Sequence, residues 1–380
     1  MKFHMRTAMR DALSMVRKAN VATATSIIKA ALLGGFARPN HSKTRSVSIS
    51  KGASSAADAE RRPLGEAIRA LRNAKSSFHR AATKPDAGSP SNTGGANPGG
   101  EGEFSSHTFA FKGGNLSYML YVPPHVAGRD LALVLMLHGC NQNPRDFANG
   151  TQMNRIADEF GLIIAYPEQP RTANMSGCWN WFDGKHQKRG SGEPEMLAGL
   201  AQKLAVEFDI EATRVFAAGL SAGGAMAEIL ASTYPQEFAA VGIHSGLPYG
   251  AANSVMSAFG AMKGKTRMVR QTSAKPHHVS RKIIFHGASD ATVHPSNGER
   301  IAKRTHELSN ELNQSVSTVD INGRKVTRTL IDDNKGRRMT EHWVVKGGGH
   351  AWFGGSNQGS YTETKGPDAS REMVRFFLEK

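Results

Sequence analysis

The sequence contains little cysteine and no long hydrophobic run. Its 380 residues include two cysteines, Cys140 and Cys178, so it has no disulfide framework of the kind found in small secreted domains, although one bridge could form. No stretch reaches the roughly 18 uninterrupted apolar residues of a transmembrane helix, and we expect no membrane span. Lys29 interrupts the mildly apolar part of the first 35 residues, which therefore lack a recognisable secretory signal. A cytoplasmic or granule-associated location is the expectation from this pattern, with the compartment otherwise open.

Acidic residues are scarce in the first quarter of the chain. Residues 1–100 hold 17 Lys and Arg against 5 Asp and Glu, and this segment accounts for most of the net charge of +16. Such a surplus predicts an anionic partner, such as an acidic membrane, a polymer granule or nucleic acid, or else a merely solvated tail. Aromatic residues are nearly absent there and no base-reading motif occurs, so sequence-specific nucleic-acid recognition is not expected.

The composition changes twice along the chain. Residues 1–35 place apolar side chains near helical spacing and predict a short amphipathic helical segment. Residues 36–103 are rich in Ser, Gly and Pro and predict a flexible basic linker. From 104 to 380, short apolar runs alternate with helix-patterned segments, which is typical of an α/β domain with a mostly parallel sheet covered on both faces. The runs are LSYMLYVPP, LALVLMLHGC, GLIIAYPE, RVFAAGL, FAAVGIHSG and RKIIFHGASD.

A serine between glycines follows the fourth of these runs. In RVFAAGLSAGGAMAEIL a predicted strand ends at Leu220 and a predicted helix begins at Ala222, so Ser221 occupies the turn of a GxSxG nucleophile elbow. Only glycine-sized neighbours at 219 and 223 would avoid collision with the adjacent strand and helix. The turn would expose the hydroxyl at a helix N-terminus, whose partial positive charge favours a developing anion. A helix-capping serine between two packing glycines is the alternative interpretation.

A serine hydroxyl needs a base to become a nucleophile, and the base needs an acid that orients it. The chain order Ser, Asp, His is met by Ser221, Asp290 and His350. Asp290 lies in a loop just after a predicted strand, and His350 follows three glycines that let its loop bend toward the serine. The weaker candidates for the acid are Asp183, Asp332 and Asp333. Structural hydrogen bonds, rather than titration, are expected of three strand-end histidines, His138, His244 and His286.

The tetrahedral intermediate of acyl transfer carries an oxyanion that needs backbone N–H donors. The N–H of Ala222 would supply one, and the N–H of Cys140, in the loop HGCNQN after an early strand, would supply the second. Cys140 itself is not expected to act as nucleophile, because the serine elbow fills that role. No His and carboxylate pair stands at the spacing of a zinc helix, and two cysteines 38 residues apart do not suffice, so we expect neither a metal nor a cofactor.

Several motifs together resemble the polyhydroxybutyrate depolymerase family of esterases, within the α/β-hydrolase superfamily. They are LMLHGCNQNPRDF, GCWNWF, the serine motif with its continuation to GIHSGLPYGAA, FHGASDATVHPSNG and GGGHAWFGG, and they cover roughly residues 105–380. The resemblance implies an α/β-hydrolase fold, with the same nucleophile, acid, base and oxyanion donors. It also implies an apolar wall for the acyl chain formed by Trp179, Trp181 and Trp352, which as bare aromatics would equally be core residues.

The resemblance also bears on the two cysteines, whose motifs look adjacent in this family. A Cys140–Cys178 disulfide is then expected in an oxidising compartment, while reduced thiols fit the missing secretory signal equally well.

The activity implied by the resemblance is that of a serine esterase. Its substrates would be polyhydroxybutyrate, hydroxyalkanoate oligomers or short-chain esters. The alternatives are a feruloyl or acetyl esterase acting on plant polysaccharide, and a granule- or membrane-docking protein whose basic N-terminal segment has the main role. Peptidase or lipase action on the same triad also stays open. Since no separate polymer-binding domain is evident, soluble esters or oligomers should be better substrates than crystalline polymer. The segment GLPYGAANSVMSAFGAMKGK, residues 246–265, is a candidate cover over the site.

Overall fold

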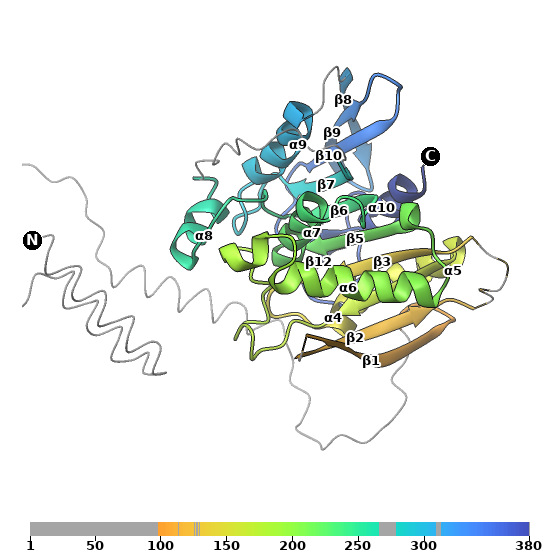
Figure 1. Ribbon diagram of the computed structural model, residues 1–380. Coiled ribbons are helices and arrows are strands. Elements are labelled where there is room, and N and C mark those ends of the chain that lie inside the picture. The colour runs from red at the N-terminus through yellow and green to blue at the C-terminus, as the bar shows by residue number, and fades with distance from the viewer. Residues whose placement is uncertain are drawn as a thin grey trace, which may run out of the picture. The chain divides into compact units, whose positions relative to one another are not determined.

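The computed structural model describes residues 98–265, 279–308 and 313–379, apart from 113, 125, 127 and 129. The predicted N-terminal helical segment, and all but the end of the predicted linker, lie outside the described residues. In the described part, a ten-stranded sheet forms the centre of the molecule, with strand order β1-β2-β4-β3-β5-β6-β7-β10-β9-β8 (Figure 1). Its strands are β1 (Glu103–Phe111), β2 (Gly114–Val122), β3 (Ala132–Leu137), β4 (Leu162–Pro167), β5 (Val215–Leu220), β6 (Ala240–His244), β7 (Arg281–Gly287), β8 (Asn313–Ile321), β9 (Arg324–Asp332) and β10 (Arg338–Val345).

The middle of the sheet is parallel. Strands β4, β3, β5, β6, β7 and β10 run in one direction, whereas β1 and β2 on one edge and β9 and β8 on the other pair antiparallel. Every residue of β3, β4, β5, β6 and β7 is buried, because helices cover both faces of a parallel sheet. The six apolar runs of the sequence all form strands here, as predicted.

Helices cover the sheet in two layers (Figure 1). In β3 the side chains of Leu133 and Leu135 enter one core and those of Val134 and Met136 enter the other, as the two-residue period of a strand requires. Residues of α6 (Gly192–Glu207), α7 (Ala222–Thr233), α8 (Val255–Met262) and α9 (Ser296–Leu308) pack in the first core. Residues of α4 (Pro144–Thr151), α5 (Met153–Phe160) and α10 (Ala369–Leu378) pack in the second. The shorter elements are η1 (Gly184–Gln187), η2 (Ala212–Arg214), β11 (Trp352–Phe353) and β12 (Thr362–Glu363).

The hairpin of β8 and β9 was not among the predicted strands. Its two-residue turn is Asn322-Gly323, and both residues have positive φ, 42° and 74°. A type I′ turn requires positive φ at both central positions, and Asn-Gly is the pair that adopts it most readily. The Asn-Gly pair in VDINGRKV was therefore the signal that would have predicted this hairpin.

The buried histidines make the folded state sensitive to acid. Burial, with a smaller contribution in the same direction from the nearby His286, lowers the pKa of His342 to about 4. Unfolded His342 would take up a proton near pH 6.5, and folded His342 only near pH 4. The unfolded state therefore binds more protons within this window, and folding stability is lost as the pH falls through it.

Replacing His342 with leucine should reduce this acid sensitivity. Its Nε2 has no hydrogen-bond partner in the described part of the chain, so the substitution removes no bond there. We expect the variant to lose roughly 2 to 3 kcal/mol less stability than the wild type between pH 6.5 and 4.5. Urea unfolding at the two pH values measures the difference. The control is His107→Leu, which alters an exposed histidine and should leave the change of unfolding free energy with pH as in the wild type. If the unfolding free energy of His342→Leu changed with pH as much as that of the wild type, His342 would not be a source of the acid sensitivity.

Candidate active site

Ser221 lies in the turn between β5 and α7, at the carboxyl end of a central strand. Its backbone has φ 57° and ψ −115°, a conformation that costs a non-glycine residue free energy. The N–H of Ser221 donates to the carbonyl of His244 at 2.8 Å, which fixes the turn against the end of β6. The residue as a whole is half-buried.

The two glycines of the motif are required by backbone contacts. A Cβ atom on Gly223 would lie 1.9 Å from the carbonyl oxygen of Leu137, at the end of β3. A Cβ atom on Gly219 would lie 2.4 Å from the carbonyl carbon of Gly223. Neither obstacle is a side chain that could move aside. The prediction that only glycine fits at both positions is confirmed.

The loop after β3 lies against Ser221. A Cβ atom added to Gly139 would be 3.7 Å from the Cβ of Ser221, so the loop backbone passes close to the serine. The neighbouring Cys140 makes no backbone N–H hydrogen bond among the described residues. The N–H of Ala222 is at the first position of α7, where a helix provides no acceptor for it. In the part of the chain that the structure describes, neither N–H group has a hydrogen-bond acceptor, and their role as oxyanion donors stays a prediction.

His138 holds this loop in place. Its Nε2 accepts a hydrogen bond from the backbone N–H of Gln169 at 3.1 Å, so its Nδ1 carries the proton and donates to the carbonyl of Gly139 at 2.8 Å. Burial lowers the pKa of His138, which keeps the ring neutral and able to accept. The structural role expected of this histidine is confirmed.

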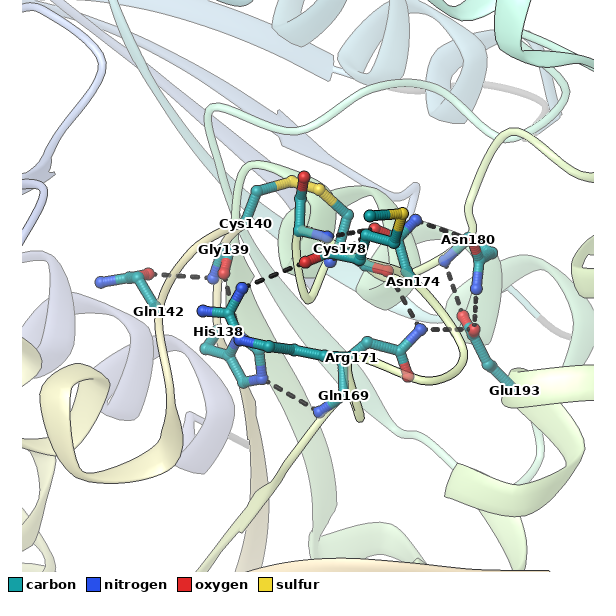
Figure 2. The surroundings of a disulfide bond; sticks show 12 residues. His138, Gly139, Cys140, Gln142, Gln169, Arg171, Asn174, Cys178, Asn180 and Glu193 are labelled. Atoms are coloured by element: carbon teal, nitrogen blue, oxygen red, sulfur yellow. Dashed lines mark hydrogen bonds between the residues drawn. A yellow bond between two sulfur atoms is a disulfide. The ribbon is translucent and has the colours of Figure 1, made fainter. Parts of the chain in front are cut away.

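A disulfide joins Cys140 to Cys178 and ties the loop after β3 to the loop before α6 (Figure 2). Beside it, the backbone N–H of Asn141 donates to the carbonyl of Ser176 at 2.8 Å. The second loop is organised by Glu193, a buried carboxylate that accepts from the backbone and side-chain amide of Asn180 at 2.7 and 2.6 Å. Glu193 also accepts from Gln169 at 2.7 Å, as Figure 2 shows. Sequence reasoning did not single out this glutamate, because nothing in its local sequence marks it as buried.

Removing the disulfide should lower both stability and turnover. The bridge spans 38 residues, for which the chain-entropy model gives about 4 kcal/mol of stabilisation. We expect Cys140→Ala/Cys178→Ala to lose a comparable free energy of unfolding and to lose several-fold in kcat, because the backbone N–H of residue 140 is no longer tethered. Dithiothreitol should destabilise the wild type and leave the double variant unchanged. If the wild type and the double variant had the same free energy of unfolding, both with and without dithiothreitol, the disulfide would not stabilise the fold.

His350 and Asp290 are brought together by the structure. The Nδ1 of His350 donates to Oδ2 of Asp290 at 2.7 Å. The other carboxylate oxygen, Oδ1, accepts from the backbone N–H groups of Thr292 and Val293 at 2.9 and 2.8 Å. With its proton on Nδ1, His350 presents the lone pair of Nε2, which is the atom a general base uses.

The environment of Asp290 keeps its carboxylate ionised. Burial raises the pKa of this group. Four effects oppose burial and together hold the pKa of Asp290 below its ordinary value. They are the hydrogen bond from His350, the charge of that ring, the N–H of Val293 and the nearby His286. Asp290 is 5% exposed, and its charge therefore acts on His350 with little screening by water.

His244 links the serine turn to the loop that carries His350. Its carbonyl accepts from the N–H of Ser221, and its Nε2 accepts from the N–H of Phe353 at 3.2 Å. Burial, together with the charges of His286 and His350, holds the pKa of His244 well below its ordinary value, so the ring stays neutral. His286 is also buried and bonded, with its Nε2–H donating to the carbonyl of Val293 at 2.8 Å. Both histidines are structural, as predicted.

Gly287 allows the segment before His350 to pack closely against the end of β7. A Cβ atom on Gly287, the last residue of β7, would lie 2.3 Å from the carbonyl oxygen of Gly348 and 2.4 Å from that of Gly349. The N–H of Ser289 donates to the Gly348 carbonyl at 2.9 Å. The segment that carries Asp290 and the segment that carries His350 therefore share a backbone contact at the carboxyl end of β7.

The competing aspartates lie in other environments. Asp183 accepts from the N–H of Lys185 at the start of η1. Asp332 pairs with Arg338, and Asp333 accepts backbone N–H groups within a turn. Among the described residues, Asp290 is the carboxylate that hydrogen-bonds to His350.

The three tryptophans are deeply buried. Trp179 and Trp181 belong to the core that includes α6 and α7, and Trp352 belongs to the opposite core. Trp352 stacks on His244 with ring centroids 5.1 Å apart, and its Nε1 donates to Ser370. At 6% exposure or less, all three have packing roles, and their contact with an acyl chain stays a prediction.

Two further predictions concern Ser221 and its cover. In the described part of the chain no hydrogen bond joins the Ser221 hydroxyl to His350, so proton transfer between them stays a prediction.

The proposed cover contains α8, whose side chains Val255, Met256 and Phe259 are exposed. The C-terminal end of α8 is fixed to the loop after Asp290, because the N–H of His294 donates to the carbonyl of Met262 at 2.8 Å.

Neither a metal cluster nor a membrane-spanning helix is found in the residues that the structure describes. Across 98–265, 279–308 and 313–379, no group of three or more His, Cys, Asp or Glu residues is arranged to hold a metal ion. Within the same ranges no helix combines the length and apolarity needed to cross a bilayer.

Comparison with known proteins places the chain in a family. The family model described as esterase PHB depolymerase matches residues 116–318, which is more than half of the chain and includes Ser221 and Asp290. The chain belongs to this family. It is 30% identical over 256 residues to poly(3-hydroxyalkanoate) depolymerase C of Paucimonas lemoignei, covering 64% of this chain and 60% of that protein. It is 28% identical over 221 residues to feruloyl esterase B of Neurospora crassa, covering 54% of this chain and 74% of that protein.

The fold is the α/β-hydrolase fold of these esterases. An acetyl xylan esterase from Aspergillus awamori superposes with a TM-score of 0.55 at 18% identity, covering 73% of this chain and 100% of that one. At this identity the similarity establishes the fold alone. The chain spans 60% of the length of the Paucimonas depolymerase and 53% of that of poly(3-hydroxybutyrate) depolymerase of Ralstonia pickettii.

Proposed function

We propose that this chain hydrolyses carboxylic esters through an acyl-enzyme, with Ser221 as nucleophile, His350 as base and Asp290 as the acid that orients it. The observation that carries the proposal is the 2.7 Å hydrogen bond from His350 Nδ1 to Asp290 Oδ2. It determines which nitrogen of His350 can accept a proton, and it lies at the same sheet edge as the strained serine turn. Membership of the esterase PHB depolymerase family supports the reaction class.

Acylation begins when Nε2 of His350 takes the proton of the Ser221 hydroxyl as Oγ bonds to the ester carbonyl carbon. The carbonyl oxygen becomes an anion and accepts hydrogen bonds from the N–H groups of Cys140 and Ala222. The bond between the carbonyl carbon and the alkoxy oxygen then breaks. His350 returns its proton to the departing oxygen, which leaves as an alcohol.

Deacylation repeats these steps with water as the nucleophile. His350 takes a proton from water as the water oxygen attacks the acyl carbon, and the same two N–H groups hold the second oxyanion. The bond to Ser221 Oγ breaks, His350 protonates that oxygen, and the carboxylic acid departs. Asp290 stays ionised throughout and stabilises the imidazolium that forms twice in each cycle.

The substrate class that we propose is a polyhydroxybutyrate-type ester, its hydroxyalkanoate oligomers and simple short-chain esters. Two relatives that are each 30% identical are named as poly(3-hydroxyalkanoate) and poly(3-hydroxybutyrate) depolymerases, which supports this class. The alternative is an aromatic or acetyl ester on polysaccharide, since other relatives are named feruloyl esterase B and acetylxylan esterase A.

A substrate panel separates these classes. The purified full chain is assayed with p-nitrophenyl esters of increasing acyl length, hydroxybutyrate oligomers, methyl ferulate and acetylated xylan. The proposal expects turnover of butyrate esters and oligomers with kcat/KM at least about tenfold above that of methyl ferulate, a difference of about 1.4 kcal/mol in transition-state binding. A higher kcat/KM for methyl ferulate or acetylxylan would favour the alternative, and no ester turnover at all would remove the proposal.

A further inference from the structure

Gln142 bonds the oxyanion loop to the segment that follows His350. Its side chain is 6% exposed, and its Oε1 accepts from the N–H of Gly139 at 2.9 Å, as Figure 2 shows. Its Nε2 donates to Oδ2 of Asp146 and to the carbonyl of Ser360, both at 3.0 Å. A carboxylate and a carbonyl can only accept, so the amide has one orientation that satisfies every partner.

Asp146 completes this junction from the first turn of α4. Its Oδ1 accepts from the N–H of Ser360 at 2.9 Å, and its Oδ2 accepts from the Ser360 hydroxyl. The N–H of Asp146 is itself held by the side chain of Asn143, the N-cap of α4. The carboxylate is therefore fixed, and hydrogen bonds to an ionised acceptor are stronger than neutral ones.

One backbone hydrogen bond joins the junction of Gln142, Asp146 and Ser360 to the segment that carries His350. The carbonyl of Tyr361, the residue after Ser360, accepts from the N–H of Trp352 at 2.7 Å, two residues beyond His350. On the other side, Gly139 lies near both residues, since a Cβ atom added there would be 3.1 Å from Gln142 Oε1 and 3.7 Å from Ser221 Cβ. Gln142 is thus bonded to the loop beside Ser221 and to Ser360, whose neighbour Tyr361 is bonded to the segment that carries His350.

The bond to Gln142 also determines which N–H of the loop stays free. Because the N–H of Gly139 is occupied, the next donor along the chain is that of Cys140, the proposed oxyanion donor. The Cys140 N–H belongs to the peptide between residues 139 and 140, one Cα atom beyond the N–H that Gln142 holds, so rotation of that peptide would misdirect this donor. An oxyanion donor acts only when it points at the position of the developing charge.

We propose that Gln142 is a positioning residue for the ester hydrolysis, which keeps the oxyanion loop in register with the His350 segment through Asp146 and Ser360. This role rests on the proposed function. It acts on the transition state more than on bound substrate, because the oxyanion exists only in the former.

The test is the kinetics of Gln142→Leu, which keeps the volume of the side chain and removes its hydrogen bonds. We expect kcat for p-nitrophenyl butyrate to fall about 10- to 100-fold with KM changed less than about threefold, and the inhibition constant of butylboronic acid to rise in parallel. The boronate forms a tetrahedral adduct on serine and therefore reports on the oxyanion hole. The matched control is Asn154→Leu, a buried amide in α5 that bonds to Tyr166, whose kcat should stay within about threefold.

A second pair of variants keeps the test decisive where Gln142→Leu folds poorly. Asp146→Ala should also lower kcat, and the double variant Gln142→Leu/Asp146→Ala should lose at most about threefold beyond the worse single variant, because both act through one junction. Three results would overturn the positioning role. They are a kcat for Gln142→Leu that equals that of the wild type, an equal loss of kcat in Asn154→Leu, and a double variant whose loss of kcat is the product of the two single losses. Absence of ester turnover in the wild type would instead remove the proposed function itself.

Discussion

Ser221→Ala is expected to lower kcat for p-nitrophenyl butyrate by about 10⁶-fold, the loss typical of removing the nucleophile of a serine triad. The substitution deletes only the hydroxyl and keeps the turn, whose N–H bond to His244 is a backbone contact. Alanine and serine meet the same cost at φ 57°, so the folded structure and its stability should change little. Residual turnover would come from the oxyanion donors and substrate binding alone.

A matched serine makes this result specific. Ser245 also follows a central strand, also has positive φ, at 49°, and is fully buried beside His244. Ser245→Ala should retain kcat within about threefold. Near wild-type turnover in Ser221→Ala, measured on protein with a wild-type unfolding midpoint, would show that another group attacks the ester.

Asp290→Asn is expected to lower kcat by about 10⁴-fold, as amidation of a triad acid does. The contacts of Asp290 explain why the effect should be this large. Its Oδ1 is held by the N–H groups of Thr292 and Val293, so the asparagine must keep its oxygen there and turn its NH₂ group toward His350. Two donors would then face each other unless His350 moved its proton to Nε2, and that tautomer cannot accept the serine proton.

The pH dependence of the folding stability of Asp290→Asn offers a second measurement. Asp290 has a lowered pKa, so the stability it contributes is present above its unfolded pKa and is lost as the pH falls through the folded value. Asp290→Asn should therefore remove part of the acid destabilisation of the wild type. Asp183→Asn, which alters a helix-capping aspartate, should leave kcat unchanged. If Asp290→Asn kept kcat within about threefold, a different carboxylate would have to orient the base.

The serine turn and the pairing of Asp290 with His350 could be predicted from sequence because they depend on local patterns. A strand followed by GLSAGG and a helix former run predicts the elbow at Ser221, and the clash distances at Gly219 and Gly223 show why the pattern has so little freedom. Asp290 and His350 were found because parallel strands end at one edge of the sheet, so that residues 60 positions apart can meet there.

The supporting contacts could not be predicted, because they join segments by geometry alone. Gln142 and Ser360 are 218 positions apart, and nothing in either local sequence indicates that they meet. Glu193 looks like an exposed helix-start residue, yet it is buried and bonded to Gln169 and Asn180 in the loop that follows β4. The Asn322-Gly323 hairpin, by contrast, had a local signal.

The measurement that tests the account most directly is peptide mapping after reaction with diethyl p-nitrophenyl phosphate. This reagent phosphorylates an activated serine and leaves unactivated hydroxyls unmodified. The account predicts a single diethylphosphoryl group on Ser221, loss of ester turnover in proportion to labelling, and much slower labelling of Asp290→Asn. Full turnover by a protein phosphorylated on Ser221, or inactivation that follows a label on another residue, would contradict it.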